Sequence, residues 1–226
     1  MFAEGHQGHF LVTTNISPKR GRPRSFDTET ALEIGQRLFH AHGYDAVGLA
    51  ALTDALGIKP PSFYKAFGSK AEFFSRVLDR YTRSSAAVAL EGILRTRRPP
   101  RDALAELLER AAQTYARDPQ LRGCLVLEAA RSGGDDEAAA LARRSAAQRR
   151  EEIRAFVALS HPDMADAVTD YVACTMSGLS ASAREGMTEA RLITVAKAAA
   201  AGLDALLSKP PRRAGSARPG ATARKA

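Results

Sequence analysis

The chain has 226 residues, of which 45% are hydrophobic, and its formal net charge is +8 at neutral pH. This length suits one large domain or two small ones, and it is sufficient for a hydrophobic core. No apolar run approaches the roughly 20 residues that a membrane-spanning helix needs, and the N-terminus lacks the pattern of a secretion signal. We therefore expect neither a membrane span nor export.

The positive charge is concentrated at the two ends of the chain, and the part between them is close to neutral. Four cations lie between Lys19 and Arg24, and six follow Ser208. Glycine and proline accompany them, so we expect residues 1–24 and 208–226 to be a disordered basic arm and tail. A high isoelectric point alone is weak evidence for nucleic acid. The tail either adds nonspecific DNA affinity or has no role.

The sequence offers little for catalysis or metal binding. Cys124 and Cys174 are far apart, which favours a reduced, cytoplasmic protein over a disulfide-linked one. His40 and His42 are two residues apart and do not share a helix face, so we expect no metal site. A phosphate-loop glycine pattern and a Ser-His-Asp motif are also missing. We expect no cofactor and no enzymatic activity.

The first expected helix runs from Thr28 to His42 and is capped by Asp27. Its apolar stripe makes it a scaffold that receives the side chains of the next helices. Leucines 49, 52 and 56 then recur at helical spacing. Gly57 follows at once and suits the left-handed position that ends a helix.

A short helix opened by Pro60 has the pattern of a recognition helix. Phe63 and Phe67 are four residues apart and share one face, which we expect to be buried. The residues on or beside the opposite face are polar, basic or small, which suits contact with a DNA groove. These candidate DNA contacts are Lys59, Pro61, Ser62, Tyr64 and Lys65.

Two further groups extend this candidate DNA surface. Ser69 to Glu72 forms a capping box that starts another helix. Its free amide groups, with Lys70 beside them, suit a DNA phosphate. Arg22 and Arg24 in the arm suit minor-groove or phosphate contacts, although a solvated tail is the alternative.

The segment from Gly21 to Tyr81 resembles the DNA-binding domain of the TetR (tetracycline-repressor) family. The matching pieces are GRPR, ALEIGQRLFHAHGYDAVGL, LGI, SFYKAF and SK, in the family's order and spacing. Two positions depart from the family's usual Thr or Ser. Gly48 removes a cap and a phosphate contact, whereas Lys59 suggests an added basic contact.

The resemblance implies an all-α fold with two parts. Residues 25–81 would form a three-helix helix-turn-helix DNA-binding domain, and residues 82–207 a helical regulatory and dimerisation domain. We expect the helix that starts at Ser69 to continue to about Leu94. The helices expected after it span residues 102–115, 122–130, 135–160, 164–184 and 188–207, and Gly133-Gly134 ends the second of these.

The last two helices carry apolar faces with small residues between them. Val168, Tyr171 and Leu179 mark the first face, and Val195 and Leu203 the second. These faces either complete the monomer core or pair with a second subunit. The resemblance favours a homodimer through a four-helix bundle, which presents two recognition helices to double-stranded operator DNA.

The resemblance also implies a cavity for a small-molecule effector in the second part. Cys124 is more simply a small buried hydrophobe than a redox or ligand contact. For Glu128 a cationic ligand and a partner in solvent or an arginine stay equally open. We predict a ligand-released repressor, with a helical protein-binding adaptor as the alternative. The candidate ligand contacts are Tyr115, Cys124, Glu128, Tyr171 and Met176.

Overall fold

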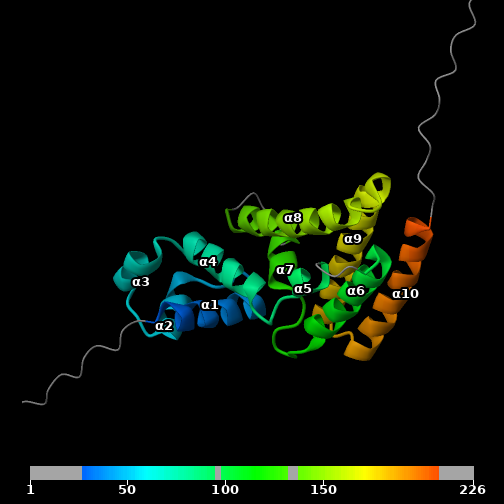
Figure 1. The fold of residues 1–226 in the computed structure, drawn as a ribbon. Coiled ribbons are helices and arrows are strands. Elements are labelled where there is room, and N and C mark those ends of the chain that lie inside the picture. The colour runs from blue at the N-terminus through cyan, green and yellow to red at the C-terminus, as the bar shows by residue number, and fades with distance from the viewer. Residues whose placement is uncertain (1–26, 95–97, 132–136, 209–226) are drawn as a thin grey trace, which may run out of the picture.

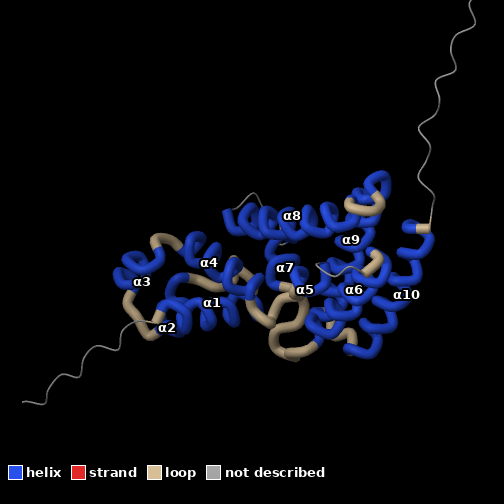
Figure 2. The backbone as a smooth tube through the Cα atoms, viewed as in Figure 1, coloured by secondary structure: helices blue, strands red, loops and turns tan. Residues whose placement is uncertain are grey.

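The computed structural model describes residues 27–94, 98–131 and 137–208, and these residues form helices and loops without a strand (Figures 1 and 2). The predicted all-α fold class is confirmed. The arm over 1–24, the tail beyond Ser208, and Gly133 and Gly134 lie outside the described residues. The helices are α1 (Thr28–His42), α2 (Leu49–Leu56), α3 (Pro60–Phe67), α4 (Lys70–Arg83), α5 (Leu90–Leu94), α6 (Pro100–Ala116), α7 (Leu125–Arg131), α8 (Glu137–Ala158), the 3-10 helix η1 (Pro162–Met164), α9 (Ala165–Arg184) and α10 (Glu189–Leu207).

Helices α1 to α4 form the head, at one end of the elongated molecule (Figure 1). Local chemistry fixes their ends as predicted. The Asp27 carboxylate accepts hydrogen bonds from the amides of Glu29 and Thr30, at 3.1 and 3.2 Å, which caps α1. Gly57 ends α2 in the left-handed conformation, with φ of 65°.

An aromatic cluster joins α1, α3 and α4 of the head. Phe63 and Phe67 of α3 are fully buried, and so is Phe73 of α4. The Phe67 and Phe73 rings lie 4.5 Å apart between centroids. A Cβ atom at Gly35 would lie 2.4 Å from the Phe73 ring, so α1 and α4 approach closely because this position lacks a side chain. The short helix α3 therefore depends on tertiary packing rather than on its own propensity.

One expected helix is interrupted. We predicted a helix from Ser69 to about Leu94, but α4 ends at Arg83 and α5 begins at Leu90. Ser84 adopts an extended conformation, and its hydroxyl donates to the Tyr81 carbonyl and accepts from the Ala86 amide. A serine side chain that bonds to nearby backbone competes with the helix ladder, which explains the break.

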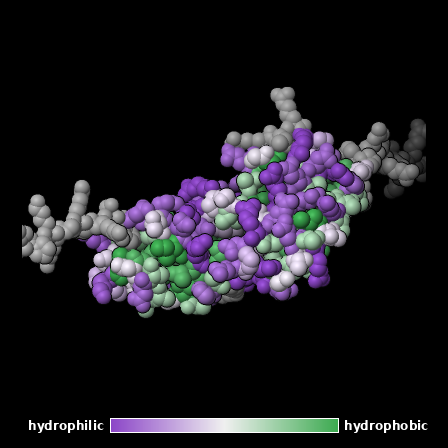
Figure 3. Space-filling view, turned by 90° about the horizontal axis from the view of Figure 1, so that it is seen from below, coloured by the Kyte–Doolittle hydropathy of each residue, from purple (hydrophilic) through white to green (hydrophobic). Residues whose placement is uncertain are grey.

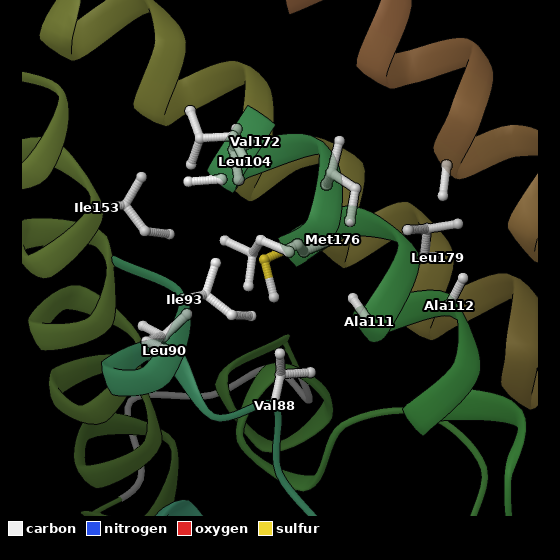
Figure 4. Packing of buried hydrophobic residues seen from close by; sticks show 14 of the residues in the cluster. Val88, Leu90, Ile93, Leu104, Ala111, Ala112, Ile153, Val172, Met176 and Leu179 are labelled. Atoms are coloured by element: carbon white, nitrogen blue, oxygen red, sulfur yellow. The ribbon is translucent and has the colours of Figure 1, made fainter. Parts of the chain in front are cut away.

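The body is built around α6, which packs against α9 and α10. Leu104, Leu107 and Leu108 of α6 are fully buried in its core. Figure 4 shows Leu90 and Ile93 of α5, Ile153 of α8 and Met176 of α9 converging on one region of this core. The face seen in Figure 3 is largely hydrophilic, with apolar side chains gathered over the head.

The apolar faces expected for the last two helices are only partly buried in the monomer core. On α10, Val195 is 46% exposed, and the neighbouring Ala196 is buried instead. On α9, Val172 is buried, whereas the expected Tyr171 is half-buried. An apolar stripe can follow either the i+3 or the i+4 step, and here packing selects the i+4 step after residues 168 and 192.

The cores of head and body meet along α7 and α8. Leu125 and Val126 of α7, with Ala142 of α8, belong to the same buried cluster as the phenylalanines of the head. A boundary at residue 81 therefore crosses a packed interface. Within the described ranges, no helix is both long and apolar enough to cross a membrane.

Candidate nucleic-acid interface and cavity

Helix α3 buries its aromatic side chains and exposes its polar ones, as the sequence predicts. Phe63 and Phe67 are fully buried, and the Tyr64 side chain is 52% exposed. The chain is also exposed at Lys59, Pro61, Ser62 and Lys65. Neither lysine forms an ion pair with a described residue. Their cationic groups are therefore available to an external anion.

The start of α4 provides a second polar group beside α3. The Ser69 hydroxyl accepts a hydrogen bond from the Glu72 amide at 3.0 Å, so the predicted cap is present. The Lys70 ammonium lies 3.9 Å from the centroid of the Tyr44 ring, a cation–π contact that holds it at the helix N-terminus. Gly48 provides no side-chain cap for α2. Arg22 and Arg24 lie outside the described residues.

A cavity of about 290 Å³ lies where the end of α4 meets the body. It brings together four of the five predicted ligand contacts, namely Tyr115, Cys124, Glu128 and Met176. Tyr171 does not line it, because its hydroxyl donates to the Ala199 carbonyl of α10 at 2.7 Å. The lining also includes Tyr81, Val88, Leu90, Leu127, Arg131, Arg149, Arg150, Ile153 and Ser177.

Glu128 is already engaged by groups of the chain itself. Arg131 donates to its Oε2 atom at 2.7 Å, and the buried Ser180 hydroxyl donates to its Oε1 atom at 2.8 Å. The Nε atom of Arg184 lies 3.7 Å from Oε2. Of the alternatives left open by the sequence, the structure favours an arginine partner, and the carboxylate charge is largely compensated.

Cys124 lies on the cavity wall between two tyrosines. It is half-buried, rather than fully buried as a core residue would be. The pKa of the Tyr81 phenol and that of the Tyr115 phenol are both raised well above the usual value for tyrosine. Burial is the larger cause, and the nearby Cys124 is the second. Both phenols therefore stay protonated and can donate hydrogen bonds near the cavity.

Arg184 joins the wall of the cavity to the head. Its Nη1 atom donates to the His40 carbonyl near the end of α1 at 3.0 Å, and to the Arg122 carbonyl at 3.2 Å. The same side chain lies beside Glu128, which lines the cavity. One guanidinium thus contacts α1, the loop before α7 and the cavity wall.

We expect Arg184→Met to lower the free energy of unfolding by about 2 kcal/mol, because a part-buried carbonyl loses a charged donor. Urea denaturation followed by circular dichroism measures the change. The control is Arg191→Met, which removes an exposed arginine of α10. Equal stabilities of the two variants would show that Arg184 does not hold the head to the body.

Sequence reasoning missed three residues of this region. Arg149 lies in a run of charges, a pattern that most simply predicts a solvated face, although Ile153 follows it at i+4 and marks an inward direction. Ser180 and Arg184 form their contacts across more than 50 residues of sequence. No local pattern signals such pairs.

Comparison with known proteins identifies the family. The model of bacterial regulatory proteins of the tetR family matches residues 31–77, which cover most of the head. The chain is 42% identical over 199 residues to the HTH-type transcriptional repressor BdcR of Escherichia coli (strain K12), which covers 88% of this chain and 100% of that relative. The chain belongs to the TetR family. The predicted resemblance is confirmed, and the chain is a DNA-binding transcriptional regulator of this family.

Other members of the family agree in sequence and in fold. The HTH-type transcriptional repressor ComR of Escherichia coli (strain K12) is 30% identical over 194 residues, which cover 81% of this chain and 92% of ComR. A cysteine mutant of the TetR family regulator CifR, solved with 26-bp operator DNA, is 33% identical with a TM-score of 0.68. The match covers 80% of this chain and 98% of the CifR chain.

Proposed function

We propose that this TetR family member is a repressor, not an enzyme, that binds a palindromic operator as a homodimer in the cytoplasm and is released by a small molecule. The observation that carries the proposal is the exposed face of α3, where two lysines without ion-pair partners among the described residues flank small and polar side chains. The relatives BdcR and ComR are named as transcriptional repressors, and CifR was solved on operator DNA, which supports this function.

The proposed DNA contacts divide into two kinds. Lys59, Pro61, Ser62 and Lys65 face the major groove from α3 and its start, where they meet base edges. Tyr64 and Lys70 hold phosphates, and Arg22 and Arg24 of the arm add contacts outside the described part. Phosphate contacts fix the register of the head on the duplex, whereas the groove-facing side chains read its sequence.

The homodimer is proposed to form through α9 and α10. Each helix has a buried stripe that completes the monomer core, and a separate exposed face remains. Cys174 and Gly178 are exposed on α9, and Val195, Ala198 and Ala201 are exposed on α10. Small residues allow close approach of helices from a second subunit, and a two-fold interface then sets the spacing of the two heads.

Release is proposed to follow from occupation of the cavity. A ligand that binds one arrangement of head and body more tightly than another shifts the population toward it. If that arrangement spaces the two heads wrongly for the operator, ligand and DNA weaken each other's binding reciprocally. The cavity lies between head and body, because Tyr81 of the head helix α4 is part of its wall. A ligand there can therefore favour one arrangement of the two parts.

The test is fluorescence anisotropy on duplexes that tile the DNA upstream of the gene, with a scrambled duplex as reference and two salt concentrations. One duplex bound about a thousandfold more tightly than the scrambled one would support specific regulation. Equal and strongly salt-sensitive binding to all duplexes would reduce the function to nonspecific contact. No binding to any duplex would favour the adaptor.

On the duplex that binds most tightly, we expect Lys65→Ala to weaken affinity about tenfold, because a groove contact is lost. Tyr64→Phe removes one hydroxyl donor and should weaken it less. Arg110→Ala removes one exposed cation from α6 of the body and serves as the control, with affinity unchanged. Sedimentation analysis of each variant checks that the dimer persists. If neither Lys65→Ala nor Tyr64→Phe affects binding, the recognition-helix assignment is wrong.

A further inference from the structure

Among the described residues, the cavity has an imbalance of charge. Three arginines and one glutamate line it: Arg131, Arg149, Arg150 and Glu128. Arg131 pairs with Glu128, and Arg150 pairs with Asp170 of α9. Among the described residues, Arg149 has no carboxylate partner. One cation of the cavity therefore has no compensating carboxylate within the described part of the chain.

The position of Arg149 makes this imbalance significant. Its side chain is half-buried, and its Nη2 atom donates to the carbonyl of Val88 at 2.5 Å, which fixes the guanidinium against the loop before α5. Glu152, one turn further along α8, lines the adjoining outer hollow with Arg149 but forms no ion pair with it. A carbonyl accepts a hydrogen bond but does not neutralise a charge, and a partly buried charge is unfavourable unless it is paired.

The remaining walls define what else a ligand must offer. Val88, Leu90, Ile153 and Met176 line an apolar part, and Figure 4 shows them around the same region of the core. Tyr115 is fully buried beside Cys124, and the Arg149 guanidinium is close enough to lower its pKa against the effect of burial. The phenol and the guanidinium thus provide hydrogen-bond donors in the wall of a largely apolar space.

From this arrangement we infer that the effector is a small apolar carboxylate whose anionic head pairs with Arg149 and accepts a hydrogen bond from Tyr115. Arginine matches a carboxylate because its planar fork donates two parallel hydrogen bonds. A cationic ligand is disfavoured because Arg131 and Ser180 already occupy Glu128. The cavity volume of about 290 Å³ equals that of about ten water molecules, at about 30 Å³ each, so the ligand must be small.

This inference rests on the proposed release by a small molecule, and it is tested first without DNA. Hexanoate and benzoate are titrated into the full chain by calorimetry, with the neutral hexanamide and benzamide as matched ligands. We expect each carboxylate to bind on the order of tenfold or more tightly than its amide, because one partner of a desolvated charge pair is missing in the amide.

The variants assign that difference to one side chain. In Arg149→Gln the advantage of the carboxylates should disappear, whereas the weak affinity for the amides should stay. Arg149→Lys keeps the charge without the fork and should retain part of the advantage. The control is Arg144→Gln on the same helix, which is exposed and does not line the cavity. No carboxylate binding, equal binding of the amides, or an equal loss in Arg144→Gln would overturn the inference.

A second arm separates this inference from the proposed function. The carboxylates and amides are added to the complex with the operator duplex, and anisotropy reports release. Binding that depends on Arg149 without release of DNA would uphold the carboxylate site and contradict ligand-released repression. Release by the amides, with equal potency in Arg149→Gln, would uphold that function and overturn the carboxylate inference.

Discussion

Replacing Phe73 with alanine is expected to lower the free energy of unfolding by about 3–5 kcal/mol and to abolish operator binding. Phe73 is fully buried, and its ring centroid lies 5.3 Å from that of Phe63 and 4.5 Å from that of Phe67. Those two rings are what anchors α3. The truncation therefore leaves a cavity at the point where the candidate recognition helix is attached, so its exposed face loses its fixed orientation.

Urea denaturation followed by far-ultraviolet circular dichroism measures the stability of this variant, and anisotropy on the operator duplex measures its affinity. Leu159→Ala is the matched control, because Leu159 is 86% exposed after α8. Exposed substitutions of this kind change stability by no more than about 0.5 kcal/mol. A loss below about 1 kcal/mol in Phe73→Ala would mean that α3 is held by something other than the aromatic cluster.

The head could be predicted well because its signals are local. Asp27 and Ser69 cap α1 and α4 through amides two or three residues away, and Gly57 ends α2 through its own backbone conformation. The burial of Phe63 and Phe67 follows from their spacing on one short helix. Each of these interactions is contained within a few residues, so the sequence alone was sufficient.

The cavity could be predicted only in part because its walls come from distant segments. Four of the five candidate ligand contacts do line one cavity, but Tyr171 points to α10, a direction that helical periodicity in α9 does not specify. The uncompensated charge of Arg149 depends on where every nearby carboxylate lies in space. The sequence pattern of a charge run is therefore the same whether its side chains face water or a ligand.

Acid is expected to weaken the contact between head and body through His40. This side chain is buried near the end of α1, and neither of its ring nitrogens has a hydrogen-bond partner within the described structure. Burial, followed by the positive charge of Arg184, lowers the pKa of His40 to about 4 from its usual 6.5. The backbone of Gly123 and of Arg122, and then Glu128, oppose this shift, and the edge-on Tyr81 ring at 5.7 Å is neutral.

The sign of the effect follows from the lowered pKa. Between pH 6.5 and 4 the unfolded chain binds a proton at His40 that the folded chain does not, so stability falls as the pH falls. The contribution of neutral His40 to the free energy of unfolding is present in full above pH 6.5. About 3 kcal/mol of it is lost by pH 4, at about 1.4 kcal/mol per pH unit. Most of the loss should therefore occur above the range in which exposed carboxylates titrate.

Urea denaturation at intervals from pH 7 to pH 4 tests this expectation in the wild-type chain, His40→Leu and His42→Leu. Leucine at position 40 forfeits no hydrogen bond and cannot bind a proton, so the stability of that variant should fall about 3 kcal/mol less across the range. His42 is exposed on the same helix, and its replacement should leave the wild-type slope unchanged. In Arg184→Met the dependence of stability on pH should become weaker, because the positive charge of Arg184 no longer opposes protonation of His40. Parallel curves for wild type and His40→Leu would show that this histidine does not stay neutral at the junction of head and body.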